Sequence, residues 1–100
     1  MSGWYIKLTP VKMGDKEQYF SGWIKHREDM PGALREILTK AHVKVGESTP
    51  MFSEDFTESL IFDHFGMATF TADKIMTTIP DFVGHCFVRK MVNYQPSNEG

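Results

Sequence analysis

The chain has little cysteine, no long apolar run and no excess of positive charge. Cys86 is its only cysteine, which excludes an internal disulfide and a cysteine-based zinc motif. No run approaches the roughly 20 apolar residues that span a bilayer. The start MSGWYIKL also lacks the basic and then apolar pattern of a signal peptide. We therefore expect a cytoplasmic protein without a membrane partner.

The formal net charge of -2 gives no general attraction to phosphate backbones, so we expect no nucleic-acid partner. With 41% hydrophobic and 24% charged residues in 100 positions, the composition is typical of one folded domain. No paired carboxylates, phosphate-binding glycine loop or nucleophile triad indicates catalysis. We expect a protein that is not an enzyme and has no cofactor.

Hydrophobic periodicity predicts strands and two amphipathic helices. Strands are expected at 4–11, 17–27, 43–45, 57–65 and 83–94, with 48–55 as a connection. The helices carry apolar stripes at Leu34, Ile37, Leu38 and Ala41, and at Ala72, Ile75, Met76 and Ile79. Pro31 suits the first turn of the first helix, capped by Asp29 or Met30, and Thr71 is the expected N-cap of the second.

This order predicts an α+β fold. Residues 1–19 form an N-terminal strand or hairpin extension, 20–94 form the main domain, and 95–100 form a flexible tail. A βαββαβ order of this kind favours a ferredoxin-like antiparallel sheet with strand order 4-1-3-2. Both helices would then cover the same face of the sheet.

Two stretches carry a family resemblance, REDMPGALREILTKAHVKV and IMTTIPDFVGHCFV. Over about residues 20–92 the chain resembles the ACT domain, a small ligand-sensing module. The resemblance implies a homodimer that binds a small-molecule effector, an amino acid or similar anion, at its interface and modulates a partner enzyme. By position it implies a ligand site of Arg27, Asp29, Met30, Gly32, Ala33 and Lys44.

The chemistry of that site follows from its residue types. Unpaired backbone N–H groups at Gly32 and Ala33 favour an anion, and Arg27 and Lys44 suit a carboxylate or phosphate. Asp29 suits an ammonium group. The alternative is that Asp29 only caps the helix while both cations are solvated. His42-Val43-Lys44 also stands where the family often has glycine-aliphatic-asparagine.

The histidines offer a second hypothesis, a metal-binding protein. In the expected sheet His26, His64 and His85 lie at one edge, and His42 lies at the same end. Imidazoles grouped in this way would bind a divalent transition metal. The alternative is that each histidine ends a strand and bonds to a backbone carbonyl or to water. Cys86 follows His85 but points to the opposite face of a strand, which indicates a buried structural thiol.

Aromatic residues are concentrated in the first quarter of the chain. They are Trp4, Tyr5, Tyr19, Phe20 and Trp23. So many rings indicate either an oligomer interface or a cover for the sheet face opposite the helices. A third hypothesis, separate from the aromatic residues, is a structural accessory subunit of a larger enzyme complex.

Overall fold

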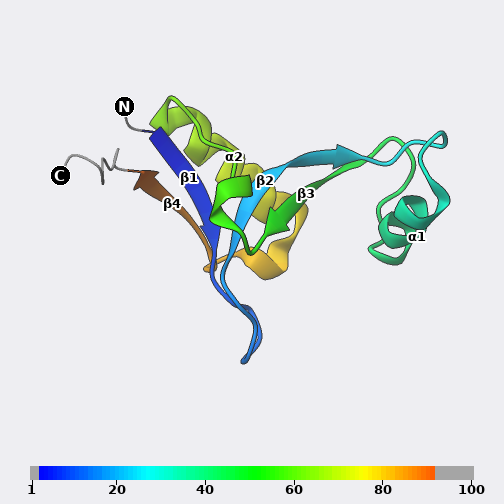
Figure 1. The fold of residues 1–100 in the computed structure, drawn as a ribbon, viewed down its shortest axis with the longest axis horizontal. Helices are drawn as coiled ribbons and strands as arrows, with labels where there is room; N and C mark the ends of the chain where they lie inside the picture. Colours follow the sequence, from blue (N-terminus) through cyan, green and yellow to red (C-terminus); the bar gives the residue numbers. More distant parts are fainter. Residues whose placement is uncertain (1–2, 92–100) are drawn as a thin grey trace.

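A computed structural model describes residues 3–91, and the predicted tail at 95–100 and the end of the last predicted strand lie outside them. The described part confirms the α+β class, with one four-stranded sheet and two α-helices (Figure 1). The strands are β1 (Gly3–Leu8), β2 (Gln18–Lys25), β3 (Ser48–Ser53) and β4 (Cys86–Met91). The helices are α1 (Gly32–Lys40), α2 (Phe65–Thr78) and the short 3₁₀ turns η1 (Phe56–Glu58) and η2 (Pro80–Phe82).

The order of the strands differs from the prediction. All neighbours are antiparallel and the order is β3-β2-β1-β4, so the predicted order 4-1-3-2 was wrong. Residues 48–53, expected as a connection, form β3, whereas 43–45 and 57–65 contain no strand beyond a single bridge between Trp4 and Phe62. The strand assigned to an N-terminal extension, β1, lies inside the sheet between β2 and β4.

Helix α2 covers one face of the sheet. The core lies between this helix and the sheet. It consists of Ile6, Leu8, Phe20 and Cys86 from the strands and Ala72 and Ile75 from the helix. The apolar stripe predicted for this helix is therefore confirmed at Ala72 and Ile75, although the helix begins at Phe65. Thr71, expected as its N-cap, is a buried residue within the helix, where its hydroxyl donates to the carbonyl of Met67 at 2.8 Å.

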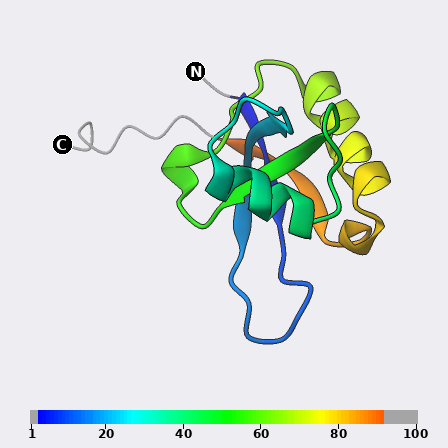
Figure 2. The ribbon, with the colours of Figure 1, turned by 90° about the vertical axis from the view of Figure 1, so that its right-hand side faces the viewer.

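Helix α1 does not pack on the sheet, so the prediction of two helices on one face was wrong. It lies at the far end of the β2–β3 hairpin, and Figure 2 shows it in front of the sheet. The N–H of His26 donates to the Glu47 carbonyl at 2.9 Å, and the N–H of Gly46 donates to the His26 carbonyl at 2.8 Å. These bonds extend the hairpin beyond its strands, and residues 26–47 are called the arm below.

The arm buries little of α1. Leu38 is its one buried residue, while Ile37 of the predicted stripe is 62% exposed. Pro31 occupies the N-cap position, and no side chain caps the helix start. Asp29 therefore does not cap the helix as expected. An amphipathic pattern predicts that a helix has one apolar face, but it does not say which surface that face meets.

A short segment, 60–62, lies between β1 and β2. These strands pair directly only at Lys7 with Tyr19 and at Leu8 with Gln18. Beyond that point the N–H of Leu60 donates to the Phe20 carbonyl at 2.9 Å. Trp4 and Phe62 exchange both backbone hydrogen bonds, at 2.9 and 2.8 Å. The segment thus satisfies backbone groups that the separating strands leave open.

Three rings pack together on the sheet face opposite α2. Tyr5 and Tyr19 project there because their neighbours Ile6 and Phe20 face the core. Phe56 of η1 meets them edge to face, with ring centroids 4.9 Å from Tyr5 and 5.3 Å from Tyr19. Part of the aromatic cluster therefore covers this face within one chain, one of the two alternatives drawn from the sequence.

Candidate functional site

The arm contains a cavity of about 440 Å³ beside the end of α1. It is lined by His26, Thr39, His42, Val43, Lys44 and Val45, and is called the arm pocket below. Two of the histidines and the lysine singled out in the sequence meet there. A volume of this size suits a small ligand.

His26 is fixed in one orientation. It is only 4% exposed, and its Nδ1 lies 2.7 Å from the carbonyl oxygen of Val43. A carbonyl can only accept, so Nδ1 carries the proton and donates. Within residues 3–91 Nε2 has no hydrogen bond and is not among the buried unpaired atoms, so it opens to solvent. The neutral ring therefore presents a lone pair, and the protonated ring presents a donor.

His42 has an unusual backbone conformation. Its φ of 62° is the one positive value among the described non-glycine residues. It ends α1 in a Schellman arrangement, because its N–H donates to the Thr39 carbonyl at 3.0 Å and the N–H of Val43 donates to the Leu38 carbonyl at 2.9 Å. Glycine is the usual residue at this position, and an imidazole here comes with local backbone strain.

A tight turn positions Lys44. Its N–H donates to the Glu47 carboxylate at 2.8 Å, and the N–H of Glu47 donates to the Lys44 carbonyl at 2.9 Å. Val43 and Val45 add apolar lining on either side of the lysine. The alternation of these two valines with Lys44 predicted a strand, so the pattern did not identify them as pocket residues. Gly46 was the signal in the sequence for a turn here, and in the structure it adopts a φ of 95°.

The predicted effector residues do not gather at one place. Arg27 pairs with Asp29 at 3.5 Å with both side chains exposed, and the Arg27 N–H donates to the sulfur of Met30 at 3.2 Å. These residues precede α1, and Gly32 and Ala33 are its first two residues, whereas Lys44 follows its end. Helix α1 spans about 12 Å along its axis, so Gly32 and Ala33 at its start lie away from Lys44 beyond its end. Arg27 lies nearer the pocket, because it directly follows His26, whose carbonyl accepts from the N–H of Gly46.

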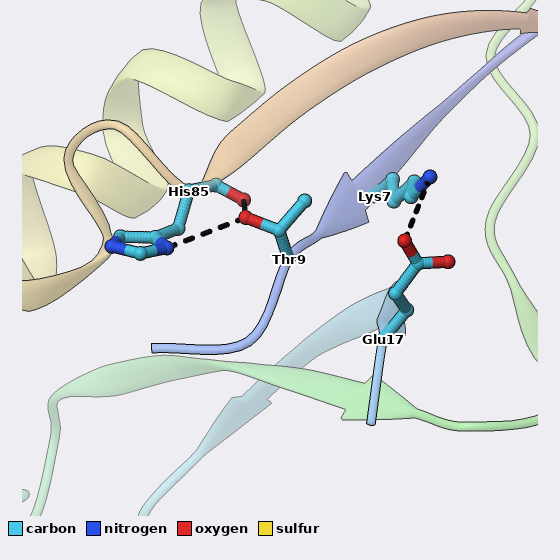
Figure 3. A network of polar contacts seen from close by, with 4 residues as sticks. All are labelled: Lys7, Thr9, Glu17 and His85. Atoms are coloured by element: carbon cyan, nitrogen blue, oxygen red, sulfur yellow. Dashed lines mark hydrogen bonds and ion pairs between the residues drawn. The ribbon is translucent and has the colours of Figure 1, made fainter. Parts of the chain in front are cut away.

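The four histidines do not converge either. His64 is exposed at the N-cap position of α2. His85 lies beside the C-terminal end of β1, just before β4 begins. Its Nδ1 is 3.3 Å from the hydroxyl of Thr9, the residue that follows β1 (Figure 3). Among residues 3–91 no three histidine, cysteine or carboxylate side chains come together as metal ligands. Only His26 and His42 share a site.

A second cavity of about 590 Å³ lies at the base of the β1–β2 loop. Near it Lys7 pairs with Glu17 at 3.0 Å, and the Thr9 hydroxyl donates to the His85 carbonyl at 3.2 Å (Figure 3). Its charged lining has both signs, from Lys12, Asp15, Lys16, Glu54 and Asp81. This mixture points to no single ligand chemistry, and the sequence predicted only a turn here.

Cys86 is buried in the core, as predicted. Burial, and secondarily the negative charge of Asp73, raises the pKa of its thiol to about 11. The group is a neutral thiol at physiological pH, which is the state of a structural cysteine rather than a nucleophile.

Comparisons with protein-family models, curated proteins and solved structures gave no match. The resemblance to the ACT domain therefore stays a prediction. Among the described residues no helix is long and apolar enough to cross a membrane.

Proposed function

We propose that this protein is a non-enzymatic regulatory protein that binds a small anionic effector in the arm pocket. The supporting observation is that His26, His42 and Lys44 line one cavity. The ligand that suits them has an anionic head for the Lys44 ammonium and for imidazole N–H donors, which His26 offers in its protonated form, and a short apolar body for Val43 and Val45. An aliphatic carboxylate has this chemistry.

The electrostatics of the pocket support an anion more than a metal ion. The C-terminal end of a helix carries partial negative charge, which favours cations. Here the carbonyls of Leu38 and Thr39 already accept the capping hydrogen bonds from Val43 and His42. The carboxylate of Glu47 bonds to the N–H of Lys44. The ammonium group of Lys44 then supplies positive charge, whereas a metal would have only two imidazoles.

Binding can be tested with a panel of short-chain carboxylates, inorganic phosphate, and zinc and nickel salts. Isothermal titration calorimetry gives affinities, and imidazole NMR signals of His26 and His42 report which side chains respond. A ligand at 100 times its dissociation constant should also raise the free energy of unfolding by about 2.7 kcal/mol. Carboxylate binding that shifts both imidazoles supports the proposal.

Two variants locate the site. His42→Gly removes an imidazole while keeping a residue that adopts positive φ easily, and Lys44→Met removes the charge from an exposed side chain. Each should weaken carboxylate binding by about tenfold or more. His64→Gln, which changes an exposed histidine outside the pocket, is the matched control. Equal binding by all three variants would contradict the proposal.

A further inference from the structure

The two edges of the sheet differ in how they are protected from pairing with another strand. At the β3 edge, the bond from the His26 N–H to the Glu47 carbonyl shows that Glu47 faces β2. In the continuing register, Thr49 also faces β2, and Pro50, opposite Trp23, faces outward. A proline there removes the N–H that an added strand would use.

The β4 edge has no such residue. The N–H of Thr9 donates to the His85 carbonyl, and the register with β1 runs unbroken from Leu8 opposite Cys86 to Gly3 opposite Met91. Alternation then turns the backbone groups of Phe87 and Arg89 toward β1. Those of Cys86, Val88 and Lys90 point outward. Within residues 3–91 no strand pairs with them.

The cations of this strand do not guard its edge. Lysine and arginine side chains that project past an edge strand are a common defence against pairing. Here the Arg89 guanidinium carbon lies 5.3 Å from the ring centroid of Phe87, and the Lys90 ammonium lies 6.0 Å from that of Trp4. Both charges are held over rings of their own chain.

We propose that the outer edge of β4 pairs antiparallel with β4 of a second copy of this chain. The two-fold axis runs between the two strands at Val88, so that Val88 of one copy lies opposite Val88 of the other. Phe87 then lies opposite Arg89 of the second copy, and Arg89 opposite its Phe87. The strand therefore complements itself with two cation–π pairs, each like the contact already present within one chain.

The pairing joins two four-stranded sheets into one continuous sheet. A contact of one short strand from each copy is smaller than the roughly 1,000 Å² of a stable interface, so the dimer is weak. It forms reversibly at high micromolar concentration. This inference does not depend on the arm pocket, which lies at the other side of the sheet beyond β3.

Sedimentation velocity between about 5 and 500 μM tests the pairing, with two variants of Phe87 as a matched pair. Phe87 lies on the face opposite α2 and is 37% exposed, so both variants leave the core intact. Phe87→Glu replaces each cation–π pair with an ion pair to Arg89 of the second copy and keeps the dimer. Phe87→Arg opposes like charges and should weaken it by about tenfold or more.

A second pair of variants tests the backbone without adding charge. Lys90→Pro removes an outward N–H, and Lys90→Ala removes the same side chain but keeps that N–H. We expect the proline variant to dimerise at least about tenfold more weakly than the alanine variant. These two decide the question if Phe87→Arg does not fold. A wild-type chain that stays monomeric to 500 μM, or a dimer that the folded Phe87→Arg or Lys90→Pro variants do not weaken, overturns the proposal.

Discussion

The Nδ1 of His26 and the carbonyl oxygen of Val43 lie 2.7 Å apart, and this bond ties the first residue of the arm to the turn after α1. It is the one side-chain hydrogen bond between these two parts of the described arm. A buried imidazole thus holds the helix, the turn and the pocket in one arrangement.

Replacing His26 with leucine should destabilise the arm. The leucine fills the space but leaves the Val43 carbonyl without its partner, at a cost of about 1–3 kcal/mol. Urea unfolding measures the decrease in the free energy of unfolding. Faster hydrogen exchange at the amides of Val43 to Glu47 would show that the decrease is located in the arm. His64→Leu, at an exposed position, should change stability by less than about 0.5 kcal/mol. Equal effects of the two substitutions would mean that the bond contributes little.

Replacing His42 with glycine should stabilise the fold by up to about 1 kcal/mol, because glycine adopts the φ of 62° without strain. His42→Val should destabilise it by about 1–2 kcal/mol, since a β-branched residue is least suited to positive φ. Thermal unfolding of the two variants makes the comparison. A glycine variant that is more stable but binds carboxylate less well would indicate that the histidine is kept for binding.

Replacing Gly3 with alanine should destabilise the sheet. The added Cβ would lie 2.7 Å from Cγ2 of Ile61 and 3.0 Å from the carbonyl oxygen of Phe62. We expect a loss of about 1–3 kcal/mol in urea unfolding. Gly32→Ala is the control, because its Cβ meets nothing within 4 Å. The Gly3→Ala, Ile61→Ala double variant should recover only part of the loss, since the Phe62 carbonyl belongs to the backbone.

The stability of the fold should fall at alkaline pH because of Cys86. Burial raises the pKa of its thiol to about 11 from an ordinary value of 9.0, so the folded state favours the neutral thiol. This contribution is fully present below pH 9 and is lost as the pH rises toward 11, by about 2 kcal/mol. Urea unfolding across that range, compared with Cys86→Ala, isolates it from the titration of lysine and tyrosine. Parallel pH profiles for the two proteins would contradict this assignment.

The sequence predicted the elements whose pattern also matches their tertiary contacts. The stripe at Ala72, Ile75 and Met76 fits a helix on a sheet, and that helix is present. The first strand and the start of the last strand were also placed correctly to within a few residues. In these segments the local pattern and the burial agree, so the periodicity is informative.

The remaining errors come from segments in which tertiary contacts override local pattern. The alternation at Val43 and Val45 occurs in a turn fixed by Lys44 and Glu47, whereas Pro50 led a true edge strand to be assigned to a connection. These two assignments, the strand expected at 57–65 and the placement of β1 outside the main sheet together produced the wrong strand order. The strand expected at 57–65 carried His64, so its absence also removes the expected grouping of histidines. The proximity of His26, His42 and Lys44 depends on how the arm folds back, which no sequence spacing reports.

The pairing of β1 with β4 has a consequence for how the molecule is made. The two strands come from opposite ends of the described residues and match over six positions. During synthesis on the ribosome, β1 would emerge first. The backbone groups on its β4 side would stay without their partner strand until β4 is synthesised. Such distant closure slows folding and prolongs the interval in which an unfinished sheet meets other nascent chains.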